Sequence, residues 1–433
     1  MPSLESIKKK LKKKAKTSPK TPVKRHTNGH AKGANGNGIT GKQSLPKPNS
    51  GVQPKGVSVY GVLRDDCERV LDDKNKPDPK TDPKLSTESL LALYRNMVFT
   101  RLYDERGMLL QRQGRIGFYV PSFGQEAIQT GTAAALAKGD WFFPSYREPG
   151  VFLYRGADPY LMLCNLFGNV ADVCKGRQMP VHYSFADLRL FSVSSPISTQ
   201  VIQATGASLA SKIRKEKDVS IAYFGDGGTS ENDFHTGLTF AGAMKTPTIF
   251  ICTNNQLAIS VPCSKQTGAK RFADKAIGYG MPGIAVDGND VLAVYKATKE
   301  AADRARRGDG PTMIECVTFR MGPHSSSDDP TRYRDEAVYE ARKKRDPIDR
   351  FRQYLSDKKI LSAKQDESLV TDLKAILADA VERAEKQPPP QIEDLFNDVY
   401  AELTPQLIRQ REAMLEEQRL RGKFENTSEA FPL

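Results

Sequence analysis

The sequence contains no long apolar run, no paired cysteine motif and few histidines. No apolar stretch approaches the roughly 18–20 residues that a membrane span needs, so we expect a soluble protein. The six cysteines form no C-x-x-C pair and no Cys/His cluster with zinc spacing. This pattern argues against a disulfide framework and a zinc site, and we expect buried, reduced thiols.

The start of the chain lacks the apolar segment of a secretory signal. It is rich in lysine, its first arginine is Arg25, and its lysines have no amphipathic partner face, which fits a mitochondrial presequence poorly. We therefore expect a cytoplasmic bacterial protein rather than one of the mitochondrial matrix.

The net charge of +13 is concentrated in a tail. Residues 1–50 hold 13 lysines and arginines and one acid, Glu5, so they account for +12 of it. This low-complexity composition predicts a disordered basic tail over residues 1–55. Lysine runs neutralise phosphates, so docking on nucleic acid or on an acidic partner is one interpretation, and a solvated linker is another. The tail has no aromatic residue for base stacking and no recognition fold, which argues against nucleic acid.

Strand and helix patterns alternate in the middle of the chain. Apolar strand patterns cover residues 219–224, 248–252, 283–286 and 312–319, and helical patterns cover 86–110, 126–137, 161–167, 230–244 and 291–306. This order predicts an α/β fold, with a doubly wound, mostly parallel sheet flanked by helices. We expect an α/β domain with N-terminal helices over residues 56–345 and a charged helical C-terminal region over residues 346–433.

A glycine-rich turn follows the first of these strands. Gly225, Asp226, Gly227 and Gly228 lead into the helical pattern at residue 230. Ligands of open α/β sheets bind at the carboxyl ends of strands beside helix N-termini, where glycines let the backbone approach a phosphate. Asp226 adds a hard oxygen ligand and Asn255, at the end of the next strand, adds an amide oxygen. Together they suit a magnesium–diphosphate site.

The chain contains a second Gly-Asp-Gly at residues 308–310. This copy precedes Pro311, starts no helix and has no asparagine pair at the matching distance. We therefore predict an ordinary helix-to-strand turn there.

The first motif, followed about thirty residues later by Asn254-Asn255, is the signature of thiamine-diphosphate enzymes. The segment GDGGTSENDFHTGLTFAGAMKTPTIFICTNNQLAIS resembles the alpha subunits of 2-oxo acid dehydrogenases, and the resemblance extends from about Ser86 to about Gln418. It implies thiamine diphosphate and magnesium as cofactors. It assigns magnesium to the side chains of Asp226 and Asn255 and the carbonyl of Leu257. Close relatives often have arginine where this chain has Thr253, so one phosphate contact differs.

The resemblance also assigns roles outside the motif. Tyr146 and Arg147 contact the cofactor, and arginine's planar fork suits phosphate oxygens. Ser195 and Ile197 hold its aminopyrimidine side. A potassium ion, found in the branched-chain members, is assigned to Ser194, Pro196, Thr199 and Gln200. A plain helix-capping turn explains this last segment equally well.

Three histidines outside the tail are candidates for proton transfer near neutral pH: His182, His235 and His324. His324 lies in a polar loop after a strand and matches the family's catalytic loop histidine, and Arg320 matches a cofactor-contacting arginine. We expect His235 either to pack in the core or to contact residues that themselves contact the cofactor, and we leave His182 undecided. Ser325 matches a serine that is phosphorylated in animal relatives, and a plain loop serine is the alternative.

No glutamate in this chain is a strong candidate for activating the aminopyrimidine. In the family this residue comes from a beta subunit, so the resemblance implies half an active site, an α2β2 heterotetramer and acyl transfer to the lipoyl arm of an acyltransferase. The segments 176–183 and 386–400 resemble the type that acts on branched-chain 2-oxo acids such as 3-methyl-2-oxobutanoate. Pyruvate and acetoin dehydrogenases are alternatives, and so is a transketolase-like enzyme, although that needs two cofactor domains in one chain.

Overall fold

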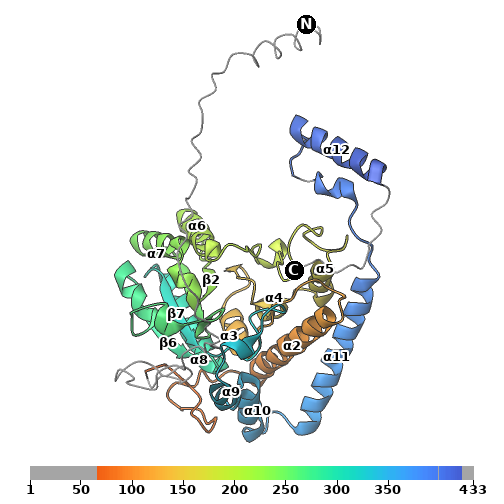
Figure 1. The fold of residues 1–433 in the computed structure, drawn as a ribbon. Helices are drawn as coiled ribbons and strands as arrows, with labels where there is room; N and C mark the ends of the chain where they lie inside the picture. Colours follow the sequence, from red (N-terminus) through yellow and green to blue (C-terminus); the bar gives the residue numbers. More distant parts are fainter. Residues whose placement is uncertain (1–65, 398, 422–433) are drawn as a thin grey trace, which may run out of the picture. The chain divides into compact units, whose positions relative to one another are not determined.

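The computed structural model describes residues 66–397 and 399–421 and is built on a five-stranded parallel sheet (Figure 1). The strand order is β1-β2-β3-β7-β6. The strands are β1 (Trp141–Phe143), β2 (Ser220–Gly225), β3 (Thr248–Asn254), β6 (Gly283–Asp287) and β7 (Thr312–Val317). The predicted α/β fold is confirmed. The predicted tail lies outside the described residues.

Both faces of the sheet are buried, because successive strand side chains point to opposite sides. On β2, Ile221 and Tyr223 join a core that includes α3 and α8, whereas Ala222 and Phe224 join a second core with α6 and α7. Parallel sheets covered in this way read as continuous apolar runs. This is the pattern that made β2 and β3 recognisable in the sequence.

The helices begin and end at residues suited to those positions. Ser86 caps α2 by accepting a hydrogen bond from the backbone N–H of Ser89, and Asp290 caps α8. Gly308 ends α8 at φ 88°, so the second Gly-Asp-Gly is the helix-to-strand turn that was predicted. The helices are α2 (Thr87–Arg112), α3 (Glu126–Ala135), α4 (Pro149–Arg155), α5 (Pro159–Phe167), α6 (Thr199–Ile213), α7 (Asn232–Met244), α8 (Val291–Arg307), α9 (Glu336–Lys343), α10 (Pro347–Asp357), α11 (Ala363–Glu385) and α12 (Pro405–Arg421).

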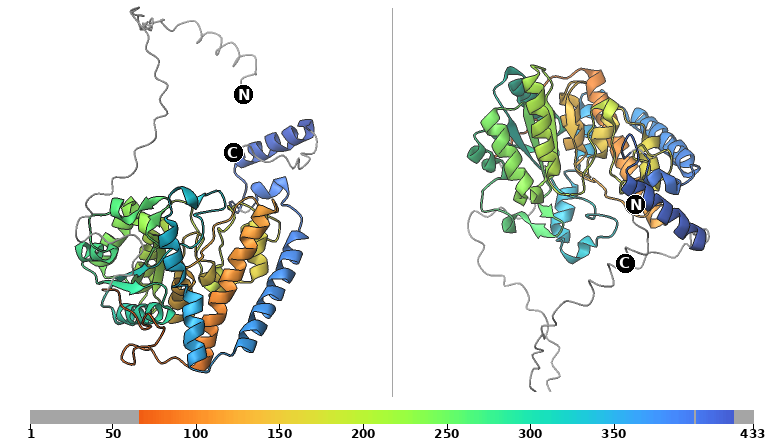
Figure 2. Two further views of the ribbon diagram at one scale, coloured as in Figure 1. Left: turned by 60° about the horizontal axis from the view of Figure 1, so that its bottom comes forward. Right: turned by 90° about the horizontal axis from the view of Figure 1, so that it is seen from above.

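The helices α10 and α11 lie beside α2 (Figure 2). Phe351 on α10 and Leu377 on α11 belong to the same core as one face of the sheet. Arg101 on α2 joins the layers, since its Nε contacts Glu126 Oε1 at 2.5 Å and its Nη1 contacts Asp346 Oδ2 at 2.9 Å. The helices α10 and α11 therefore pack against α2, and α2 in turn packs against α3 and α4.

A short hairpin follows β3, with strands β4 (Leu257–Ala258) and β5 (Val261–Pro262). Its turn places Ile259 at φ 55°, an unusual conformation for a β-branched residue. All six cysteines are free; Cys67, Cys164, Cys252 and Cys316 are buried as expected, whereas Cys174 and Cys263 are partly exposed. Within the described ranges, no helix has the length and apolarity to cross a membrane.

Candidate functional site

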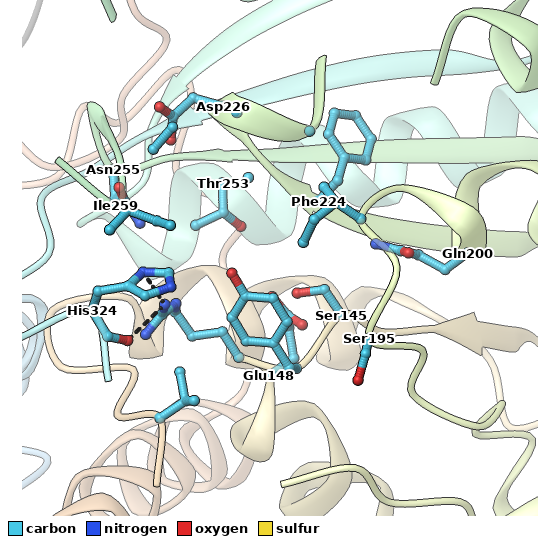
Figure 3. A pocket seen from close by; sticks show the side chains of 18 of the residues that line it. Ser145, Glu148, Ser195, Gln200, Phe224, Asp226, Thr253, Asn255, Ile259 and His324 are labelled. Carbon is cyan, nitrogen blue, oxygen red and sulfur yellow. Dashed lines mark hydrogen bonds between the residues drawn. The ribbon is translucent and has the colours of Figure 1, made fainter. Parts of the chain in front are cut away.

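A cavity of about 490 Å³ lies where β1, β2, β3 and β7 end, within the size range of cofactor sites. Figure 3 shows Asp226, Asn255 and His324 around one part of it, with Ser195 and Gln200 farther along. Thr199 does not line it and is the first residue of α6. Every other predicted site residue does: Tyr146, Arg147, Ser194, Ser195, Pro196, Ile197, Gln200, Gly225, Asp226, Gly227, Gly228, Asn255, Leu257, Arg320 and His324.

The glycine-rich turn brings three segments close together. A Cβ atom on Gly227 would lie 2.7 Å from Ala258 Cβ, and one on Gly228 would lie 2.7 Å from Ser198 Oγ. Both positions therefore need glycine for close approach. A 3-10 turn from Asp226 to Ser230 comes before α7, where the sequence predicted a helix beginning at residue 230.

Asp226 is buried and its environment suits a bound cation. Its side chain is 1% exposed, and burial raises the pKa of its carboxyl to about 6. The Asn255 Oδ1 atom accepts from the Leu257 N–H at 3.2 Å, and the Leu257 carbonyl accepts from Arg320 Nη1 at 3.2 Å. No three His, Cys, Asp or Glu side chains in the described part of the chain could share a metal ion. A cation here would be coordinated by one carboxylate, by uncharged protein oxygens and by oxygens of a bound anionic ligand. Magnesium favours this kind of coordination.

Two buried guanidinium groups provide the opposite charge. Arg147 is 5% exposed and Arg320 is 2% exposed. Arg147 Nη1 donates to the Pro121 carbonyl at 2.6 Å, and Arg320 Nη2 donates to the Ile259 carbonyl at 2.7 Å. The Arg320 Nε atom is buried and has no hydrogen-bond partner among the described residues. Because both guanidinium groups bond mainly to uncharged carbonyl oxygens, their positive charge is available to an anion in the cavity.

Arg147 also determines which nitrogen of His324 carries the proton. Its Nη2 lies 3.1 Å from His324 Nδ1 and 3.0 Å from the His324 carbonyl (Figure 3). A guanidinium only donates, so Nδ1 accepts and the proton of the neutral ring is on Nε2. Burial, with Arg147 and Arg320 nearby, lowers the pKa of His324 to about 3. At neutral pH His324 is therefore a neutral imidazole with an N–H donor at Nε2.

His182, whose role the sequence left undecided, lines the same cavity. Its Nδ1 lies 3.0 Å from the Pro180 carbonyl, which only accepts, so this nitrogen carries the proton. Its Nε2 then accepts from Ser195 Oγ at 2.8 Å, which leaves the Ser195 oxygen as an acceptor. His235 is exposed on α7 and contacts Tyr279, outside the cavity.

Several cavity residues were not identified in the sequence. Glu148 is 4% exposed, burial raises its pKa to about 7, and its Oε2 has no partner in the ranges described. The hydroxyl of Thr253, which the sequence analysis singled out, also lines the cavity and is buried without a partner in those ranges. The sequence signal that could have identified Glu148 is its position directly after the predicted site residues Tyr146 and Arg147. Ser325 is buried, and its Oγ accepts from the Ser327 N–H at 3.4 Å.

The segment before α6 does not cap the helix with a side chain. Gln200 Nε2 donates to the Tyr223 carbonyl at 2.6 Å, and its Oε1 is buried with no partner among the described residues. Ser198 is the N-cap residue of α6, but its hydroxyl donates to the Gly228 carbonyl at 2.8 Å instead of capping the helix.

A cofactor-binding α/β enzyme is the class that this sheet and cavity define, and comparison with known proteins narrows it. The family model for the dehydrogenase E1 component matches residues 94–393, and the chain belongs to this family. It is 46% identical to the 3-methyl-2-oxobutanoate dehydrogenase subunit alpha of Mycobacterium tuberculosis over 330 residues, which is 76% of this chain and 88% of the relative. The mitochondrial 2-oxoisovalerate dehydrogenase subunit alpha of Homo sapiens is 41% identical over 366 residues, 84% of this chain and 81% of the relative. The resemblance stated from the sequence is confirmed.

Proposed function

We propose that this chain is the alpha subunit of a branched-chain 2-oxo acid dehydrogenase and holds the magnesium diphosphate of thiamine diphosphate. The observation that carries the proposal is the set of charges in one cavity, whose lining includes the buried Asp226 carboxylate and the buried Arg147 and Arg320 guanidinium groups. A magnesium diphosphate satisfies both, because the cation neutralises the carboxylate and the phosphate oxygens accept from the guanidinium groups.

The residues present fit this group. Asp226, Asn255 and the Leu257 carbonyl would hold magnesium, and glycines 225, 227 and 228 would let the diphosphate approach the backbone. Tyr146 and Ile197 line the cavity beside them and would contact the cofactor. The unpartnered Gln200 Oε1 supports a potassium ion near Ser194, Pro196 and Thr199.

Thiamine diphosphate, when bound, supplies the electron sink for decarboxylation of a 2-oxo acid. The chain's own residues would orient the reacting groups through hydrogen bonds. His324 lines the cavity with an N–H donor at Nε2 and would donate a hydrogen bond to the reacting centre or to a phosphate oxygen. Ser195 offers a hydrogen-bond acceptor, because its proton is committed to His182.

A beta subunit supplies the other half of the site in this proposal. Three acids of this chain line the cavity, Asp226, Glu148 and Glu231; Asp226 is assigned to the metal, and we assign activation of the aminopyrimidine to a glutamate of the beta subunit. Apolar side chains on the cavity rim are exposed, with Met179 at 50%, Ile197 at 43% and Ile259 at 55%, which suits a partner surface. The resulting α2β2 tetramer passes its acyl group to the lipoyl arm of an acyltransferase.

The names of these two relatives support a branched-chain substrate, 3-methyl-2-oxobutanoate or a close analogue. Pyruvate and acetoin are the competing substrates.

The test is to purify this chain alone and with its beta subunit and to measure release of carbon dioxide from 3-methyl-2-oxobutanoate. We expect activity only from the mixture, and it should require both thiamine diphosphate and magnesium. Substantial decarboxylation by the chain alone would overturn the half-site proposal.

A further inference from the structure

Gln266 reaches the Asp226 carboxylate from the loop that follows the β4–β5 hairpin. Its Nε2 donates to Asp226 Oδ2 at 2.6 Å and to the Val261 carbonyl at 2.9 Å. The segment from Asn255 to Gln266 therefore turns back on itself, so that a residue 40 positions after Asp226 in the chain contacts its side chain.

The orientation of this amide follows from its neighbours. Both contacts are with oxygens that only accept, a carboxylate and a carbonyl, so the atom between them must be the NH2 group. Turned the other way, the amide oxygen would face two acceptors. Gln266 thus ties Asp226 to the hairpin with both of its N–H groups.

The other side of the hairpin is also held in place. Arg320 Nη2 donates to the carbonyl of Ile259 at 2.7 Å, at the turn where Ile259 adopts φ 55°. A β-branched residue keeps such a conformation only when surrounding contacts impose it. The hairpin is therefore a fixed support on which Gln266 can position Asp226.

The chemistry of an amide suits this position. The side-chain contacts of Asp226 with Gln266 and, more weakly, with Cys263 Sγ at 3.9 Å both go to Oδ2. An uncharged donor restrains the carboxylate without neutralising it, whereas lysine or arginine there would compete with a metal ion for its charge.

We infer that Gln266 is a positioning residue for the metal–diphosphate site, holding Oδ2 of Asp226 so that the carboxylate meets the cation in one orientation. The inference rests on the proposed function. Outer partners of this kind typically contribute 10–100-fold to metal affinity.

The test uses the full chain reconstituted with its beta subunit and thiamine diphosphate, with Mn²⁺ as the probe and free Mn²⁺ followed by electron paramagnetic resonance. Gln266→Met keeps the length of the side chain and removes both N–H donors, and we expect Mn²⁺ affinity to fall about 10–100-fold. Thr267→Val is the matched control, because it removes a hydrogen bond between Thr267 Oγ1 and the Ala269 N–H in the same loop. Its affinity should equal that of the wild type.

A second variant and a melting curve separate positioning from simple bracing of the loop. Gln266→Lys keeps a donor but adds a cation, so it should weaken Mn²⁺ binding more than Gln266→Met does, at an unchanged melting temperature of the metal-free complex. Wild-type affinity in both variants would overturn the inference, as would a loss of affinity that simply follows the loss in melting temperature. If the wild type itself binds no Mn²⁺ with thiamine diphosphate, the proposed function fails first.

Discussion

Replacing His324 by glutamine and by asparagine distinguishes a hydrogen-bond donor from a general base. Arg147 donates to Nδ1, so the neutral ring carries its proton on Nε2. The glutamine amide places an N–H group close to the position of Nε2, whereas the shorter asparagine places it near Nδ1. If donation from Nε2 is the role of His324, glutamine preserves it and asparagine does not.

The magnitude follows from the value of one donor in an enclosed site, which is about 10²–10³ in kcat. We expect His324→Asn to lose about that factor and His324→Gln to stay within about tenfold of the wild type. The assay is the steady-state decarboxylation rate of the reconstituted complex at saturating substrate and thiamine diphosphate. Because the pKa of His324 is lowered to about 3, its protonation should produce no limb in the pH dependence of kcat near neutrality.

Two results would refute this reasoning. One is an equal loss in the asparagine and glutamine variants, which would mean that neither N–H position matters. The other is a wild-type limb with an apparent pKa near 6.5 that disappears in His324→Gln, as expected for a histidine that acts as a base.

Three further predictions concern other residues of the site. Asp226→Asn should weaken magnesium-dependent binding of thiamine diphosphate by more than about tenfold in calorimetry, while Asp309→Asn in the second Gly-Asp-Gly leaves it unchanged; equal effects would contradict the assignment of the metal site. Glu148→Gln should raise the free energy of unfolding of the cofactor-free complex at about pH 8 by up to about 3 kcal/mol. The pKa of Glu148 is 4.5 when unfolded and about 7 when folded, so the wild type loses stability as the pH rises from 4.5 to about 7, whereas glutamine has no proton to lose. Urea unfolding at about pH 5 and pH 8 checks this, and a variant no more stable than the wild type at the higher pH would contradict it. Gln200→Leu should abolish any thermal stabilisation by KCl over NaCl, and a persisting difference would place potassium elsewhere.

The elements that the sequence predicted well are those buried on both faces or capped by suitable residues. The strands β2, β3 and β6 agree with their apolar runs to within two residues at each end, and α8 agrees because Asp290 and Gly308 mark its ends. The strand β7 ends at Val317, two residues before the predicted end, where the chain leaves the sheet toward Arg320.

The strand β1 could not be predicted, because Trp141–Phe143 is too short to show a period. Its place in the sheet is set by pairing with β2, through Trp141 and Ser220, which are far apart in the chain. Long-range pairing of this kind leaves no local signal.

The residues of the site also divide into those that a sequence motif identifies and those that only the fold brings together. Asp226 and Asn255 belong to one motif with a characteristic spacing and were identifiable from the sequence. Gln266 and His182 matter because separate segments meet in the fold, so that Gln266 reaches Asp226 and His182 reaches Ser195. No spacing in the sequence indicates either contact.

The measurement that tests the central claim most directly is a comparison of kcat/KM for 3-methyl-2-oxobutanoate and pyruvate, using this chain reconstituted with its beta subunit, thiamine diphosphate and magnesium. The account predicts a clear preference for 3-methyl-2-oxobutanoate, with activity lost when either cofactor is omitted. A preference for pyruvate, or turnover that needs neither cofactor, would contradict it.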